Sequence, residues 1–117
     1  MATTKTLMTA EQLLGIAGSR RCELVRGELV EMSPVGKTHS WIVALLLSWM
    51  VSFVREHKLG RVGTELGFIL ARNPDVVRAP DICFVSAQRW KGTDPHGFFE
   101  GAPDLAVEVV SDRKSVV

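Results

Sequence analysis

The chain has 117 residues, of which 46% are hydrophobic and 23% charged, and its formal net charge is +1. This composition excludes a disordered chain and predicts one packed domain. The near-neutral charge excludes nucleic-acid binding through a bulk basic field, so any such contact would need a local basic patch or a metal ion.

The first half of the sequence predicts a short helix, a hairpin and a long apolar helix. Thr9, with Gln12 three residues later, forms a capping-box pattern at a helix start. Residues 22–32, CELVRGELVEM, predict a β-hairpin, because Gly27 can adopt the positive φ of a tight turn. Residues 41–54, WIVALLLSWMVSFV, fall short of the about 20 residues that span a bilayer. We interpret them as a buried core helix, part of which can face a partner subunit.

The second half predicts strands and loops. Residues 60–70 predict a strand with glycine irregularities, residues 73–75 (NPD) a turn, and residues 80–86 (PDICFVS) a second strand. Residues 91–104 are rich in glycine and proline and predict a loop. Residues 105–110, LAVEVV, predict a strand that should be central. This order predicts a mixed α/β (α+β) fold, with a central mixed sheet and the long buried helix on one face.

Both ends of the sequence carry expectations about the whole protein. The N-terminal residues contain no apolar signal core, so we expect a cytoplasmic protein and no membrane segment. No covering helix follows the last predicted strand. We therefore expect the single domain, residues 1–117, to be truncated at its C-terminal end, or to take cover from another chain.

Two predicted strands each carry one acid among apolar residues. Asp81 shares a strand face with Cys83, and Glu108 shares one with Ala106. If these faces align, the acids meet, and two carboxylates about 4 Å apart repel by about 4 kcal/mol at an effective dielectric near 20. Protonation or a divalent cation relieves this repulsion, and oxygen ligands suit Mg²⁺. Structural pairing with arginine is the alternative, and the candidates are Arg20, Arg21, Arg78 and Arg113.

The phrases PDICFV and PDLAVEVVSD resemble the PD…(D/E)-x-K signature of the restriction-endonuclease-like nuclease superfamily. ELVRGELVEMSP, the following His39 and PDLAVEVVS resemble the Uma-two family of putative restriction endonucleases, over residues 8–111. This resemblance implies a restriction-endonuclease-like core and an endonuclease that hydrolyses DNA with Mg²⁺ or Mn²⁺. It also suggests a homodimer, for which the apolar helix 41–54 offers a surface.

The resemblance also implies site residues. Asp81 and Glu108 would be catalytic, metal-binding carboxylates, and Glu23 would be a further metal-binding acid from the upstream element. The lysine expected two residues after the last acid is replaced by Val110, which leaves Lys114 as the nearby candidate. Without a positioned cation, the developing phosphorane charge loses a stabilising partner.

Two smaller features and two rival interpretations remain. His39 could act as an acid, a base or a ligand, or simply as a capping or surface residue, and Glu65 is a candidate further ligand. The first rival is a catalytically inactive or truncated nuclease-fold module that serves in binding or assembly. In the second, the acids are structural salt-bridge partners in a protein with no nucleic-acid role.

Overall fold

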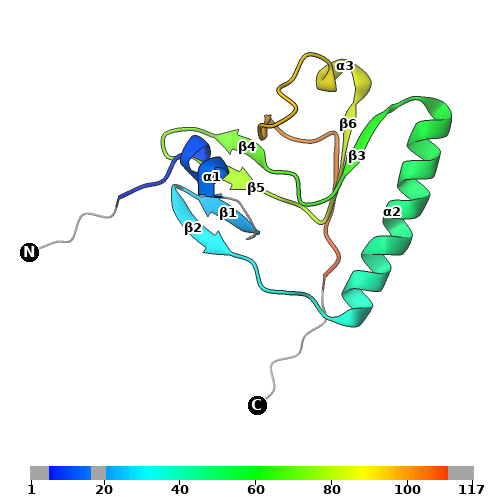
Figure 1. The fold of residues 1–117 in the computed structure, drawn as a ribbon, viewed down its shortest axis with the longest axis horizontal. Helices are drawn as coiled ribbons and strands as arrows, with labels where there is room; N and C mark the ends of the chain where they lie inside the picture. The colour runs from blue at the N-terminus through cyan, green and yellow to red at the C-terminus, as the bar shows by residue number, and fades with distance from the viewer. Residues whose placement is uncertain (1–5, 17–20, 111–117) are drawn as a thin grey trace, which may run out of the picture.

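The computed structural model describes residues 6–16 and 21–110, which form two small sheets and three helices (Figure 1). The elements are α1 (Ala10–Ile16), β1 (Cys22–Val25), β2 (Glu28–Glu31), α2 (Lys37–His57), β3 (Gly60–Gly63), β4 (Phe68–Ala71), β5 (Val76–Arg78), β6 (Ile82–Ser86), α3 (Ala87–Trp90), β7 (Phe99–Glu100) and β8 (Leu105–Val107). One sheet has five strands in the order β2-β1-β5-β4-β7, and the other has three in the order β3-β6-β8. The predicted mixed fold with one long helix is confirmed, since β4 and β7 are parallel and the other paired strands antiparallel.

The predicted capping box and hairpin are both confirmed. The Thr9 amide donates to the side-chain oxygen of Gln12 at 2.9 Å, and the Gln12 amide donates to Thr9 Oγ1 at 3.1 Å. In the hairpin, β1 and β2 are joined by Arg26 and Gly27, whose φ angles are 52° and 78°. Two consecutive positive φ values are the signature of the turn whose twist matches two paired strands.

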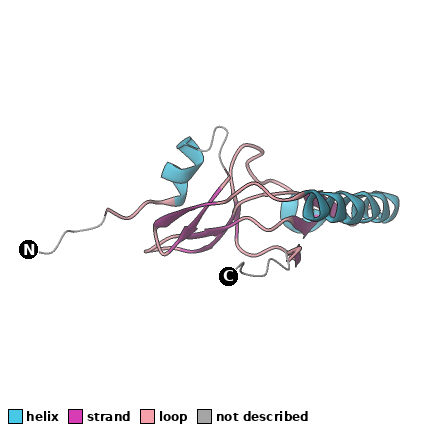
Figure 2. Cartoon of the chain, turned by 90° about the horizontal axis from the view of Figure 1, so that it is seen from below, coloured by secondary structure: helices cyan, strands magenta, loops and turns pink. Residues whose placement is uncertain are grey.

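The core lies in two clusters. The first is made by α1 and the five-stranded sheet and contains Ala10, Leu13, Leu24, Ile69 and Val77. The second joins the two sheets and contains Phe68, Cys83, Val85 and Phe99. The predicted loop 91–104 thus holds a short strand, β7, because Phe99 packs on Phe68 with ring centroids 5.7 Å apart. Seen from below, the chain forms a thin layer, with α1 above the sheet and α2 at one side (Figure 2).

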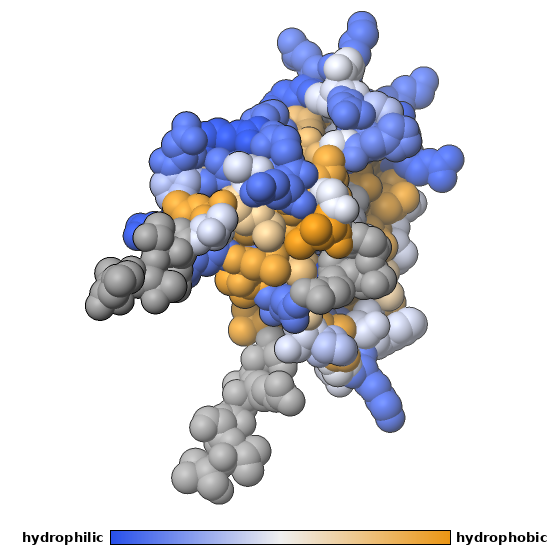
Figure 3. Space-filling view, turned by 60° about the vertical axis from the view of Figure 1, so that its left-hand side comes forward, coloured by the Kyte–Doolittle hydropathy of each residue, from blue (hydrophilic) through white to orange (hydrophobic). Residues whose placement is uncertain are grey.

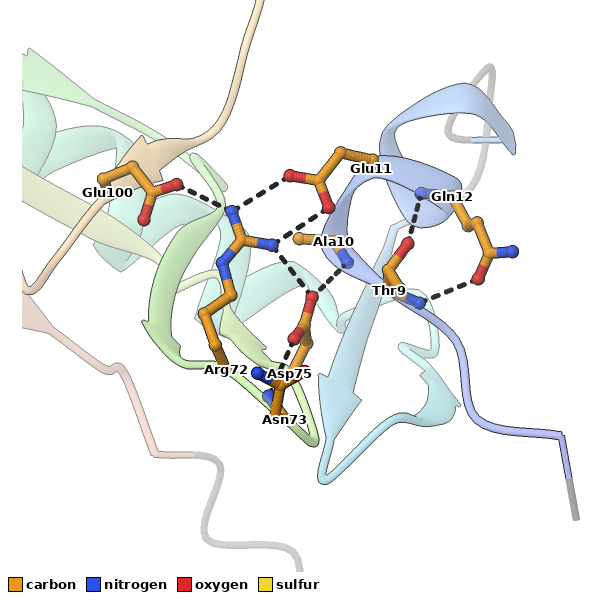
Figure 4. Close-up of polar contacts among 8 residues, drawn as sticks. All are labelled: Thr9, Ala10, Glu11, Gln12, Arg72, Asn73, Asp75 and Glu100. Atoms are coloured by element: carbon orange, nitrogen blue, oxygen red, sulfur yellow. Dashed lines mark hydrogen bonds and ion pairs between the residues drawn. The ribbon is translucent and has the colours of Figure 1, made fainter.

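A polar network fastens α1 to the five-stranded sheet (Figure 4). The Arg72 guanidinium donates to Glu11 at 2.9 Å, to Asp75 at 3.0 Å and to Glu100 at 2.7 Å. The amide of Ala10 donates to the Asp75 carboxylate at 2.8 Å. The hydrogen bond from Arg72 lowers the pKa of Glu11, and the one from the Ala10 amide lowers the pKa of Asp75. These acids raise the pKa of Arg72 in turn, so the network favours the charged forms.

The interpretation of residues 41–54 as a buried core helix is wrong for the described part of the chain. The helix α2 packs beside β3, and Val54 is its buried residue. Its large side chains face outward, with Trp41 and Trp49 each 64% exposed and Phe53 56% exposed. By length and composition, α2 is one candidate membrane span among the described residues, a criterion that helices of soluble proteins also meet. Its apolar surface is therefore open to a partner.

Two predicted strands also differ from the observed ones. Residues 60–70 form two strands in different sheets, because the chain bends at Glu65, whose φ is 56°. The strand predicted at residues 105–110 ends at Val107, and it is an edge strand, with β6 in the centre of its sheet. The site residues near Glu108 therefore lie at the open end and edge of this sheet.

Candidate functional site

Asp81 and Glu108 lie together at one end of the three-stranded sheet. The strands β6 and β8 are antiparallel, and Ile82 pairs with Val107, so the next residues outward on the two chains are Asp81 and Glu108. The Asp81 amide donates to Glu108 Oε1 at 3.2 Å, and the Val109 amide donates to Asp81 Oδ2 at 2.8 Å. The prediction that these acids meet is confirmed. We call Asp81 and Glu108 the acid pair.

The acid pair has one buried and one open member. Asp81 is 7% exposed, whereas Glu108 is an exposed residue. Two basic side chains approach Asp81: Arg21 Nη2 lies 3.4 Å from Oδ1, and His39 Nε2 lies 3.4 Å from Oδ2. Residue His39 is in the first turn of α2, so this helix and two strands all contribute to the same place. A buried carboxylate is tolerated when it is paired and hydrogen-bonded in this way.

Of the four arginines that the sequence offered as structural partners of the acids, Arg21 contacts Asp81. Its Nη2 also donates to the Ala79 carbonyl at 2.6 Å, which fixes the guanidinium beside Asp81. Its buried Nε has no hydrogen-bond partner within the described chain, and Glu65 Oε1 lies 3.9 Å away. A buried donor without a hydrogen bond costs free energy. The sequence feature that could have pointed to Arg21 is its position two residues before Glu23.

A hollow of about 450 Å³ opens beside this guanidinium. It is lined by Arg21, Glu31, Met32, Ser33, Pro34, Val35 and Glu65. The predicted candidates His39 and Glu65 both lie near the acid pair. His39 contacts Asp81, and Glu65 lies 3.9 Å from Arg21. The hollow is connected to the acid pair through Arg21, which lines it and contacts Asp81.

Glu23 lies close by, but its carboxylate contacts other groups. Its Oε2 accepts a hydrogen bond from the Ala79 amide at 2.7 Å, and its Oε1 lies 3.4 Å from Arg78 Nε. Glu23 is 8% exposed and holds the segment that leads to Asp81. Its direct contact with a metal stays a prediction.

The described residues contain no group of three or more His, Cys, Asp or Glu side chains that could hold a metal ion. Mg²⁺ keeps several waters and needs only one or two protein carboxylates, so the donor chemistry of the acid pair fits such an ion. Val110, at the position of the expected lysine, is 85% exposed. Lys114, the predicted replacement, lies outside the described residues.

Comparisons with known proteins concern the family and the fold of the chain. The family model Uma2, described as "Putative restriction endonuclease", matches residues 9–116. Among solved structures, the chain is similar to a putative nuclease belonging to DUF820 from Anabaena variabilis ATCC 29413, with a TM-score of 0.68 at 22% sequence identity. The match covers 92% of this chain and 61% of that one. No curated protein matches the sequence.

Proposed function

The chain belongs to the Uma2 family of putative restriction endonucleases, and from this premise we propose that it is a divalent-metal-dependent endonuclease that hydrolyses DNA phosphodiester bonds. One observation carries the proposal. The acid pair lies at a sheet edge with the Arg21 guanidinium 3.4 Å from Asp81, and Arg21 also lines a hollow. Carboxylates that suit a hard cation, next to a fixed guanidinium that suits a phosphate, fit phosphodiester hydrolysis.

In this proposal, each side chain has a separate task. Asp81 and Glu108 hold Mg²⁺ or Mn²⁺, which when bound supplies Lewis-acid character and a more acidic water. The hydrogen bond from the Val109 amide keeps the Asp81 carboxylate in one orientation. Arg21 binds the phosphate oxygens and stabilises the charge that develops on them, which is the task of the absent lysine. His39 Nε2, which lies 3.4 Å from Asp81 Oδ2, can hold or move a proton beside the acid pair.

The proposal is tested by nicking of supercoiled plasmid with Mg²⁺ or Mn²⁺. The parent protein should nick the plasmid, while Asp81→Asn and Glu108→Gln proteins should not. Glu56→Gln is the matched control, because Glu56 is an exposed acid of α2 that takes part in no ion pair within the described chain. A parent that nicks no better than Asp81→Asn would remove the nuclease proposal.

Glu23→Gln completes this set of variants. The amide oxygen of glutamine can still accept from the Ala79 amide, so the segment before Asp81 keeps its anchor. If Glu23 also contacts the metal, as the resemblance implies, the variant should need a higher Mg²⁺ concentration for half-maximal nicking. An unchanged requirement would restrict Glu23 to positioning.

The second candidate function is a catalytically inactive nuclease-fold module that serves in DNA binding or assembly. The observation in its favour is Val110, a neutral and 85% exposed side chain where the motif has a lysine. The two functions separate cleanly in experiment. An inactive module gives no nicking at any Mg²⁺ or Mn²⁺ concentration, whether it binds DNA or serves in assembly.

We also propose that two copies associate through α2. Trp49 and Phe53 are one helical turn apart, so they lie on one side of the helix, and both are more than half exposed. They line an apolar groove with Leu46, Met50, Leu59, Phe84 and Leu105. A contiguous apolar patch of this kind marks an interaction site.

A further inference from the structure

A second hollow, of about 500 Å³, lies at the opposite end of β6 from the acid pair. Four cationic side chains from three different elements line it: Arg55 in the last turn of α2, Lys58 at its C-cap, Arg61 in β3, and Lys91 at the C-cap of α3. Its other lining residues are Val54, Gly60, Ala87 and Trp90. We call this site the basic hollow.

The cations of the basic hollow have no acidic partner within the described part of the chain. Neither Arg55, Lys58, Arg61 nor Lys91 forms an ion pair among the described residues. No acid lines the hollow either. The whole sequence carries a formal charge of only +1, so four cations here represent a strong local separation of charge. Figure 3 shows hydrophilic side chains gathered at the upper end of the molecule, where Figure 1 places α3.

Helix capping explains part of this cluster. Arg55 and Lys58 interact favourably with the carbonyl end of α2, and Lys91 does the same for α3. Arg61 has no such reason to be there, because it is an exposed residue of β3. Like charges gathered without acids repel one another, so the arrangement favours an anionic ligand. A substitution of Arg61 therefore tests ligand binding without disturbing a helix cap.

We infer that the basic hollow binds the phosphate backbone of a DNA duplex, and so positions this substrate relative to the acid pair. The inference rests on the proposed function. The strand β6 connects the two sites, with Asp81 immediately before it and Ser86 at its end. At roughly 3.3 Å per residue the sites lie roughly 17 Å apart. Phosphates recur about every 3.4 Å per strand along a duplex, so one short duplex can contact both.

The test is DNA binding without cleavage. Fluorescence anisotropy of a labelled duplex of 20 base pairs is measured in EDTA at several salt concentrations, for the parent and for the Arg61→Gln protein. Each lost phosphate contact weakens binding and lowers the magnitude of the slope of log affinity against log salt by about 1. The Arg61→Gln, Lys58→Gln double variant should lose about twice this slope.

The control is Arg26→Gln, which removes the same charge from the β1–β2 turn of the other sheet. Its slope should stay at the parent value. The inference is overturned if Arg26→Gln and Arg61→Gln weaken DNA binding equally. It is also overturned if the parent does not bind the duplex at about 50 mM salt, where binding to phosphates is strong. If DNA binding depends on Arg61 but the protein never nicks plasmid, the result would support DNA binding at the basic hollow and contradict the proposed nuclease activity.

Discussion

Asp81 and Glu108 each accept a hydrogen bond from the other's segment: the Asp81 amide donates to Glu108 at 3.2 Å, and the Val109 amide donates to Asp81 at 2.8 Å. The two carboxylates thereby continue the β6–β8 pairing beyond its last backbone pair, Ile82 with Val107. These two hydrogen bonds hold the acids next to each other. The two acids differ in exposure, because Asp81 is buried whereas Glu108 is exposed to solvent.

The first prediction concerns metal binding in the absence of DNA. Mg²⁺ should raise the thermal unfolding temperature of the parent, because a ligand that binds the folded state stabilises it by about 2.7 kcal/mol at 100 times its Kd. The Asp81→Asn protein should show no such rise, since it loses a charged ligand but can still accept from Val109. Circular dichroism melts with Mg²⁺ and with EDTA make the measurement. Equal shifts for both proteins would place the ion elsewhere.

The second prediction concerns Arg21. Its replacement by glutamine should lower the nicking rate by roughly a hundredfold, because a positioned donor to the developing charge is lost. Arg21→Lys should restore part of the rate, since it keeps the charge but not the planar fork. Single-turnover rates at saturating DNA separate this effect from weaker binding. Arg26→Gln is the control, and an undiminished rate for Arg21→Gln would contradict the role.

The third prediction concerns α2. Trp49→Ser should convert dimers to monomers, because a buried interface tryptophan contributes about 2 kcal/mol or more, or more than tenfold in Kd. Light scattering coupled to size-exclusion chromatography measures the mass, with Glu56→Gln as the control on the same helix. A parent that is monomeric at high concentration would exclude the dimer. Flotation of the parent with lipid vesicles would assign the apolar groove to a membrane instead.

The fourth prediction concerns pH and Arg72. The pKa values of Glu11 and Asp75 are lowered from their ordinary 4.5 and 3.8, so their ionised forms stabilise the fold. This contribution is fully present above those ordinary values and is lost as the pH falls through the lowered ones. Thermal stability should therefore drop below about pH 4.5. The Arg72→Gln protein should have a lower melting temperature than the parent at pH 7. Its melting temperature should also fall less than that of the parent when the pH is lowered. Parallel melting curves for both proteins would contradict the network.

The fifth prediction concerns the core. Leu24→Ala should destabilise the protein by about 2–5 kcal/mol, because Leu24 is 0% exposed and a cavity remains after truncation. Its partner across the hairpin, Leu29, is 37% exposed. Leu29→Ala should therefore cost much less, and urea unfolding of the two variants compares them directly. Similar losses would mean that β1 does not lie over the core as described.

Local patterns predicted the local structure well. The Thr9–Gln12 capping box and the Arg26–Gly27 turn depend on hydrogen bonds and φ angles within a few residues, so the sequence specified them. The buried acid of a strand was equally visible, because alternation placed Asp81 among apolar neighbours. The apolar residues 41–54 do form a helix, as predicted, but the prediction that this helix is buried was wrong. Hydropathy does not show whether another part of the chain is available to cover an apolar helix.

The sequence by itself determined the mixed fold, the family resemblance and the place of one acid in each of two apolar segments, because these depend on strand periodicity and on short motifs. The tertiary structure paired β6 with β8 and so brought Asp81 to Glu108. Only the tertiary structure decided which cations accompany the acids and where the free cations gather. Arg21 is 60 residues from Asp81 in the sequence, and the basic hollow combines residues of α2, β3 and α3. Arg55, Lys58 and Arg61 are already close in the sequence, but Lys91 joins them, and Arg21 joins Asp81, only through chain packing that no local pattern records.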